Sequence, residues 1–290
     1  MRPVIFDTDI GTDVDDILAL TLLAKATELK LIGVTTVYGN TLLRSQIARV
    51  TCDLLRRSDV TVVCGQEETL TQRQIHWAGN EGYGIPDLVK ADVLTSRNAV
   101  DYLLESAEHF PGQLEVLATG PLTNIARAIQ KDGPRFSRIK HLYLMGGAFW
   151  LDRAEHNIRC DPEAAKVVFE SGIQITAIGL DLTLRVLLNS NDVHQIAQLG
   201  NGVGALLEDQ ILRWWELKQI TANHPHDPLA ALAMVRPDLF RFESWDVDVT
   251  SEGRVEGFTR LREPAKGNVR IGADLFARTA EKEIVRRIVS

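Results

Sequence analysis

The sequence contains no block of lysine or arginine residues. Its 32 basic residues are outnumbered by 39 acidic residues, which gives a formal net charge of -7. Proteins that bind nucleic acid through its phosphate backbone need clustered positive charge. The composition therefore excludes nucleic acid as the expected partner and favours a small molecule.

Cysteine is scarce, and long apolar runs are missing. The three cysteines, Cys52, Cys64 and Cys160, are odd in number and lack the paired spacing of a zinc site. No apolar run is long enough to span a bilayer, and the N-terminus shows no basic region followed by an apolar signal core. We therefore predict reduced, buried thiols, no membrane partner and a cytoplasmic location.

Repeats, low-complexity tracts and linkers are also missing, so residues 1–290 are expected to form a single domain. What the sequence does contain is an alternation of apolar runs, such as PVIF and LEVLATG, with helix-period stretches such as DILALTLLAKA. Strands that are apolar throughout are typical of parallel sheets covered on both faces. The predicted fold class is α/β, with an open, mostly parallel or mixed central sheet and helices on both faces.

Ligands of such sheets collect at the carboxyl ends of the strands. From about Leu187 the pattern becomes helical, before two short strands flank the turn SEGR at residues 251–254. Nearly every polar cluster of the sequence follows one of the predicted strand ends. These ends are Asp7, Val37, Gly65, Thr119, Gly146 and Gly179.

Five aspartates lie in the stretch VIFDTDIGTDVDD, residues 4–16. Carboxylates this close repel one another, and burying them is costly unless a cation lies between them. Asp15 and Asp16 begin a predicted helix, whose N-terminus favours negative charge, so one of the pair is explained as a cap. Asp7 and Asp9 are not explained in this way, and an all-oxygen site indicates calcium or magnesium rather than zinc.

Two chemistries share this opening. In a haloacid-dehalogenase-like phosphohydrolase, Asp7 would attack phosphorus and Asp9 would handle the proton, with magnesium as the metal. Such enzymes carry a late Gly-Asp motif, and this chain contains no Gly-Asp dipeptide. The other chemistry is metal-assisted attack of water on a sugar carbon, which needs a cation, a carboxylate base and groups that hold hydroxyls.

Polar residues after later strands leave both structural and functional interpretations open. Asn40, in VYGNT, is a turn residue or a side chain that lines the site. Thr123 and Asn124, in LATGPLTNIA, are helix caps or ligands. Glu155 and Asn157, in AEHNIRCDPEAA, offer an acceptor and an amide for vicinal hydroxyls, or are solvated loop residues.

Two Asp-Pro pairs indicate helix starts, since proline suits the first helical position. Asp161 is explained as such a cap. Asp227, in HPHDPLAAL, has the same structural explanation, but His224 and His226 lie beside it. A histidine can donate a proton to a leaving group while a neighbouring carboxylate binds metal.

Taken in order, these segments resemble the inosine-uridine-preferring nucleoside hydrolase family over nearly the whole chain. The resemblance implies a Rossmann-like sheet, a bound Ca²⁺ ion and hydrolysis of the N-glycosidic bond of ribonucleosides to free base and ribose. It also implies a homodimer or homotetramer. The segments that carry it are FDTDIGTDVDDILAL, TTVYGNT, ATGPLTNIA, LMGGAF, AEHNIRCDPEAA and HDPLAAL.

The resemblance also implies roles for individual residues. Asp9 would be a metal ligand and the base that takes a proton from the attacking water, and His226 would protonate the departing base. The other metal ligands would be Asp16, the carbonyl of Thr123, and Asp227. The residues that contact the substrate would be Asp15, Asn40, Glu155 and Asn157.

Three departures from the family pattern leave questions open. The segment IGTDVDD is two residues longer than the commoner form, so Asp13 and Asp15 compete for the sugar-facing position, and we favour Asp15. A Gly-Asn that often follows MGG is missing, which leaves open a relative that binds a ribosyl ligand without turnover. The segment HWAGNEGYG displaces His76 relative to its glycines, so His76 receives no role and the preferred base is not predicted.

Overall fold

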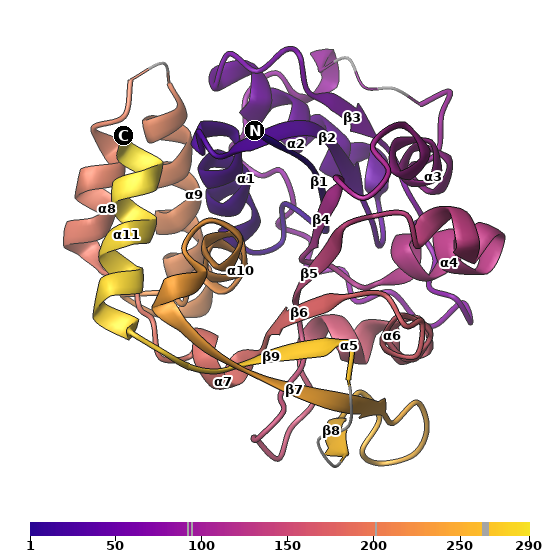
Figure 1. Cartoon of the computed structure of the whole chain (residues 1–290). Helices are drawn as coiled ribbons and strands as arrows, with labels where there is room; N and C mark the ends of the chain where they lie inside the picture. The colour runs from indigo at the N-terminus through magenta and orange to yellow at the C-terminus, as the bar shows by residue number, and fades with distance from the viewer. Residues whose placement is uncertain (92, 94, 201, 263–266) are drawn as a thin grey trace.

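The computed structural model covers the 290-residue chain and describes residues 1–91, 93, 95–200, 202–262 and 267–290. Its centre is a sheet in which the described residues form nine strands, in the order β3-β2-β1-β4-β5-β6-β9-β7-β8 (Figure 1). The strands from β3 to β9 in this order run parallel, whereas β7 and β8 are antiparallel to their neighbours. In sheet order, their bounds are β3 (Thr61–Val63), β2 (Leu29–Thr36), β1 (Arg2–Thr8), β4 (Glu115–Ala118), β5 (His141–Met145), β6 (Ile175–Ile178), β9 (Val269–Leu275), β7 (Phe240–Val249) and β8 (Thr259–Arg262).

Helices cover both faces of this sheet, as Figure 1 shows. One face packs against α3 (Ala99–His109), α4 (Thr123–Phe136) and α6 (Pro162–Phe169). The other packs against α1 (Asp15–Lys25), α2 (Thr41–Leu54), α8 (Ser190–Ala197), α9 (Val203–Lys218), α10 (His226–Val235) and α11 (Ala277–Val289). Short elements complete the chain: α5 (His156–Cys160), α7 (Leu180–Thr183), η1 (Leu88–Lys90) and η2 (Pro237–Leu239).

The alternation of side chains along β1 explains why both faces need a helical layer. Val4 and Phe6 point into the core under α1 and α10, whereas Ile5 points into the core under α3 and α4. All three side chains are fully buried. A strand that is apolar at every position is stable only when both of its faces are covered.

The order of the strands places a crevice between β1 and β4. The chain builds the sheet outward from β1 to β2 and β3, and then returns to place β4 on the other side of β1. Asp7 near the end of β1 is in register with Thr35 of β2 and Ala118 of β4, so the three strands end together. Open α/β sheets bind ligands at such a reversal, outside the carboxyl ends of the strands.

The predicted fold class is confirmed, and the predicted strand ends lie within two residues of the observed ones. The helices after Leu187 are confirmed as α8 to α10. The C-terminal strands differ from prediction, because β7 is ten residues long and β9, which was not predicted, lies between β6 and β7. All three cysteines are free, but only Cys52 is buried. No helix of the described residues has the length and apolar character needed to cross a membrane.

Candidate active site

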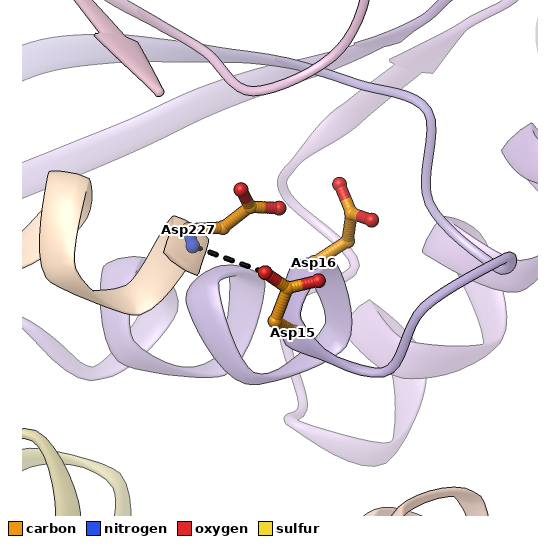
Figure 2. Close-up of side chains that lie close together, drawn as sticks. All are labelled: Asp15, Asp16 and Asp227. Atoms are coloured by element: carbon orange, nitrogen blue, oxygen red, sulfur yellow. Dashed lines mark hydrogen bonds between the residues drawn. The ribbon is translucent and has the colours of Figure 1, made fainter. Parts of the chain in front are cut away.

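Three aspartates from two distant segments meet at the carboxyl ends of the strands. Asp15 and Asp16 begin α1, and Asp227 lies in the first turn of α10 (Figure 2). Their carboxylate oxygens include a set that lies within 4.8 Å of one another. The three residues are at most 4% exposed. Since α1 packs against α10, the two helix starts are held side by side.

None of these aspartates caps its helix. The N-cap position of α1 is Val14 and that of α10 is Pro225, and neither helix has a side-chain cap hydrogen bond. The contact between the two segments is made by Asp15, whose carboxylate accepts the backbone N–H of Asp227 at 3.2 Å. The expectation that one of Asp15 and Asp16 serves as a cap is therefore wrong, and their carboxylates remain available to a ligand.

The electrostatics of this cluster favour a bound cation. Burial, followed by the charge of Asp9, raises the pKa of Asp16 to about 7. Burial and the neighbouring carboxylates raise the pKa values of Asp15 and Asp227 well above their ordinary range. Burial and the repulsion between carboxylates thus outweigh the positive charge of Arg44, which favours the ionised form of Asp16. A divalent ion bound by oxygen atoms would supply that charge, so the donor set fits a metal site.

A cavity of about 410 Å³ opens above the aspartates. Asp9, directly after β1, lines it and is 9% exposed. Burial raises the pKa of Asp9, and its own charge raises the pKa values of Asp15, Asp16 and Asp227. Asp9 therefore acts electrostatically as a fourth member of the cluster.

Glu155 and Asn157 form another wall of this cavity and are not solvated loop residues. They are 2% and 6% exposed. The Glu155 carboxylate caps α5 by accepting the backbone N–H groups of Asn157 at 2.8 Å and Ile158 at 3.0 Å. The Asn157 amide donates to the carbonyl of Thr119 at 2.6 Å. These bonds hold two polar side chains rigidly beside the aspartates.

His226 lies beside Asp227 and also lines the cavity. Its Nδ1 is 2.7 Å from the hydroxyl of Thr183 in α7, which fixes the orientation of the ring. Burial, with smaller contributions from His224 and Arg153, lowers the pKa of His226 to about 4. The ring is therefore neutral at pH 7 in this state, and it can act as an acid only if a leaving group with developing negative charge raises that pKa.

Two residues with predicted site roles lie outside the cavity. Asn40 is exposed and serves as the N-cap of α2, where its side chain accepts the backbone N–H of Leu43 at 2.9 Å. Thr123 begins α4, and its hydroxyl donates to the carboxylate of Asp161 at 2.6 Å. Asn40 is therefore a helix cap, as its structural interpretation states. Thr123 is not a cap, because the N-cap position of α4 is Leu122 and no side chain caps that helix.

Thr119 is the residue of this segment that faces the site. It follows β4 directly, lines the cavity, and donates its hydroxyl to Asp16 at 3.2 Å. The motif ATGPLTN contains Thr119 and Thr123, and the predicted metal-binding carbonyl was that of Thr123, at the helix start. The signal for Thr119 was its position at a strand end next to β1, where the carboxyl ends of the strands converge.

Other residues of the cavity clarify questions that the sequence left open. Asp13 and Asp15 both line the cavity, but Asp13 is half-buried and only Asp15 belongs to the three-carboxylate cluster. His76 lines the cavity, where its ring lies edge-on to that of His156 with 6.1 Å between the ring centroids. Among the aromatic residues, Trp214 also lines it.

The phosphohydrolase alternative is not compatible with the position of Asp7. Its side chain is fully buried, and its Oδ1 accepts hydrogen bonds from Thr35 at 2.5 Å and Asn124 at 2.7 Å. Burial raises the pKa of Asp7 to about 7. A carboxylate enclosed below the cavity floor cannot reach a phosphorus atom. Asp7 instead joins β1 to β2 and to α4.

The fold and the site together define a hydrolase class: an open α/β sheet with a buried, metal-compatible aspartate cluster and polar groups for a sugar at its strand ends. The model of the family described as "Inosine-uridine preferring nucleoside hydrolase" matches residues 4–282. The chain therefore belongs to this family, whose reaction is hydrolysis of the N-glycosidic bond of ribonucleosides.

Individual relatives agree with this membership. The chain is 34% identical to uridine nucleosidase 1 of Arabidopsis thaliana over 281 residues, which cover 91% of this chain and 82% of that protein. The solved structure of a plant nucleoside hydrolase matches with a TM-score of 0.88 and 26% identity, covering 100% and 99% of the two chains. A purine-preferring ribonucleoside hydrolase from Gardnerella vaginalis matches with a TM-score of 0.86 and 28% identity, covering 99% and 98%.

Proposed function

We propose that the protein hydrolyses ribonucleosides with a Ca²⁺ ion held by the carboxylates of Asp9, Asp15, Asp16 and Asp227. The observation that carries the proposal is the set of three buried carboxylates within 4.8 Å of one another, from the starts of α1 and α10. Calcium accepts six to eight oxygen ligands in flexible geometry, which suits carboxylates from separate loops. Bound there, the ion would lower the pKa of water and hold ribose hydroxyls.

The carbonyl of Thr119, rather than that of Thr123, is the proposed main-chain ligand. Thr119 is among the residues that line the cavity, whereas Thr123 is not. The Thr119 carbonyl already accepts one hydrogen bond from Asn157, and a carbonyl oxygen has a second lone pair. Strand β4 thus contributes one oxygen from the centre of the sheet.

The walls of the cavity are proposed to hold the ribose. Glu155 and Asn157 are fixed by their hydrogen bonds and line the same cavity as Asp15. Cleavage passes through a transition state that resembles an oxocarbenium ion. Buried carboxylates beside the ring stabilise its developing positive charge more strongly than they stabilise a neutral substrate.

Asp9 and His226 are the proposed proton carriers. Asp9 lines the cavity next to the cluster, so its carboxylate is placed to accept a proton from the attacking water. His226, at the start of α10, donates a proton to the departing base, and the hydroxyl of Thr183 holds its Nδ1. This role matters most for bases that leave poorly as anions.

Uridine is the proposed first substrate, because uridine nucleosidase 1 of Arabidopsis thaliana is 34% identical over 91% of this chain. The Gardnerella vaginalis relative prefers purines, so inosine belongs in the same comparison. The test is release of reducing sugar from uridine, cytidine, inosine and adenosine, each with and without a chelator.

Three outcomes separate the candidate functions. Turnover that a chelator abolishes and Ca²⁺ restores supports the proposal. Turnover that persists in chelator contradicts the metal. Tight binding of ribose without turnover supports instead a relative that binds a ribosyl ligand and does not cleave it.

Two wider features are also proposed. The free thiols of Cys52, Cys64 and Cys160 support a reducing compartment such as the cytoplasm. The resemblance to the family supports a homodimer or homotetramer, which sedimentation of the purified protein tests.

A further inference from the structure

Arg44 is a charged side chain in the interior beside the candidate active site. It lies in the first turns of α2 and is 1% exposed. The hydrogen bonds of its guanidinium group go to backbone carbonyls and a hydroxyl rather than to a carboxylate. Trp77 packs against it, with 5.0 Å between the Arg44 Cζ and the ring centroid. Burial of a cation without a direct counter-ion is costly, so its other contacts must provide the compensation.

Those contacts join the two loops that follow β1 and β2. Nη1 donates to the carbonyl of Asp9 and, at 2.9 Å, to the carbonyl of Ile10. Nη2 donates to the hydroxyl of Thr12 at 3.3 Å, and Nε donates to the carbonyl of Tyr38 at 2.7 Å. A planar fork of five donors suits such a set of oxygens in a way that a lysine ammonium does not.

Both loops need such support. Residues 9–14 lie outside the helices and strands, and Gly11 among them has a φ of 115°, which L side chains rarely adopt. Tyr38 has a φ of 70°, which costs a non-glycine residue on the order of 1 kcal/mol. The Arg44 guanidinium holds the carbonyls of Asp9 and Ile10 in the first loop and the carbonyl of Tyr38 in the second. Without it, several carbonyl groups of the loop would lack a donor.

The same loop carries the catalytic carboxylate. We propose that Arg44 is a positioning residue that holds the main chain of residues 9–12 so that Asp9 faces Asp15, Asp16 and Asp227. The consequence for catalysis rests on the proposed function, whereas the consequence for the loop does not. The guanidinium donates its hydrogen bond to the carbonyl of Asp9, while its positive charge lowers the pKa of the Asp9 carboxyl against the larger effect of burial.

The direction of the change in metal affinity separates positioning from charge. If Arg44 acted only through its positive charge, its removal in Arg44→Met would raise the affinity of the site for Ca²⁺. If Arg44 positions Asp9, the same variant should bind Ca²⁺ about 10- to 100-fold more weakly, as is typical when the groups that orient metal ligands are removed. Isothermal titration with Ca²⁺ measures this affinity. An unchanged or raised affinity in folded Arg44→Met overturns the inference.

Arg49→Met is the matched control. Arg49 lies further along α2, is 8% exposed, and donates to the carbonyls of Val60 at 2.7 Å and Arg57 at 2.9 Å, away from the aspartates. It should lower the melting temperature as Arg44→Met does, but leave Ca²⁺ affinity within about twofold. Equal losses of affinity in both variants would show a general effect of destabilisation and overturn the inference.

Two further measurements keep the test decisive. Hydrogen exchange of the amides of residues 10–13 should accelerate in Arg44→Met and not in Arg49→Met, whether or not the wild type binds Ca²⁺. Unchanged exchange overturns the inference even if nucleosides are cleaved, and absence of Ca²⁺ binding in the wild type overturns the proposed function alone.

If Arg44→Met does not fold, Arg44→Lys serves instead, because it keeps the positive charge and loses the planar fork of donors. This variant should also bind Ca²⁺ more weakly, and wild-type affinity in Arg44→Lys contradicts positioning.

Discussion

At the scale of single residues, the structure distinguishes Asp15 from Asp13, the two candidates for the sugar-facing position. Asp15 shares the buried cluster with Asp16 and Asp227, and Asp13 only lines the cavity. The packing of α1 against α10 brings the two helix starts together, and Asp15 adds a hydrogen bond by accepting the N–H of Asp227. The geometry thus supports the assignment of Asp15 to the sugar and metal side of the site, which mutagenesis can test.

The first prediction concerns Asp9. Replacement of Asp9 by Asn removes the proton acceptor without a change in shape, so turnover of uridine should fall by at least about 100-fold while the fold stays intact. The half-buried Asp13→Asn is the control and should retain most of the activity. Steady-state kinetics with circular dichroism measure both, and a loss in Asp13→Asn as large as that in Asp9→Asn would reverse the assignment.

The second prediction concerns His226. His226→Ala should reduce turnover of inosine far more than turnover of nitrophenyl riboside, because nitrophenolate leaves without a proton. The difference is expected to reach about 100-fold, within the usual range for general acids. Parallel assays of the two substrates test this. Equal losses on both would remove the role of His226 as acid.

At the scale of elements, the loop of residues 76–84 closes one side of the site through Glu81. The Glu81 carboxylate, which is 9% exposed, accepts the hydroxyl of Thr12 at 2.9 Å and the backbone N–H groups of Ala78 at 3.1 Å and Gly79 at 2.8 Å. It therefore links this loop to the loop that carries Asp9. His76 and Ala78 of the same loop line the cavity.

The third prediction follows from that link. Glu81→Gln should loosen the loop, raise KM for nucleosides by about 10-fold, and change kcat less, because uniform binding is lost while the aspartate cluster is kept. The exposed Glu68→Gln, whose carboxylate accepts a hydrogen bond from the side chain of Gln72, is the control and should match the wild type. A fall in kcat without a rise in KM would show that Glu81 acts on the reaction itself.

The sequence predicted the elements well where a single local pattern decides them. Apolar runs and strand-end polar residues correctly located β1 to β6, because fully buried parallel strands differ sharply from amphipathic helices. Strand β9 was missed because its buried and exposed side chains follow no regular alternation, so its sequence VRIGADL has neither the continuous apolar run of a central parallel strand nor a period of two. Its pairing with β6 and β7 depends on contacts distant in sequence, which no local pattern contains.

The site was predictable in its chemistry and less so in its geometry. Asp9, Asp15, Asp16, Glu155, Asn157, His226 and Asp227 all line the cavity. Thr123 and Asn40 do not, because they lie at the starts of α4 and α2, beyond the ends of β4 at Ala118 and of β2 at Thr36. Arg44 left no signal, since a buried arginine in an amphipathic helix looks like a surface residue in sequence.

At the scale of the whole molecule, the aspartate cluster couples folding to pH and to the metal. The pKa values of Asp7, Asp13 and Asp16 are raised to about 7 from an ordinary 3.8, chiefly by burial. The metal-free folded state therefore binds more protons than the unfolded state between these values. Its free energy of unfolding falls as the pH rises through that window.

The fourth prediction is a melting temperature that depends on both pH and Ca²⁺. The chelated protein should melt at a lower temperature at about pH 8 than at about pH 5. Calcium binds the ionised carboxylates, so it should stabilise the protein more at pH 8, by about 4 kcal/mol at 1,000 times Kd. Scanning calorimetry of both forms measures this. Equal stabilisation at the two pH values would show that the ion does not bind to these carboxylates.

That residues 1–290 fold as one unit stays a prediction, which a single transition in the same scans would support.

The central claim is that oxygens from β1, α1 and α10 meet around one hard cation. A crystal of the protein grown with Ca²⁺ tests it most directly. The account predicts an ion bound by Asp9, Asp15, Asp16 and Asp227, at metal–oxygen distances of roughly 2.3 to 2.6 Å. An ordered site without an ion, in crystals at saturating Ca²⁺, would contradict it.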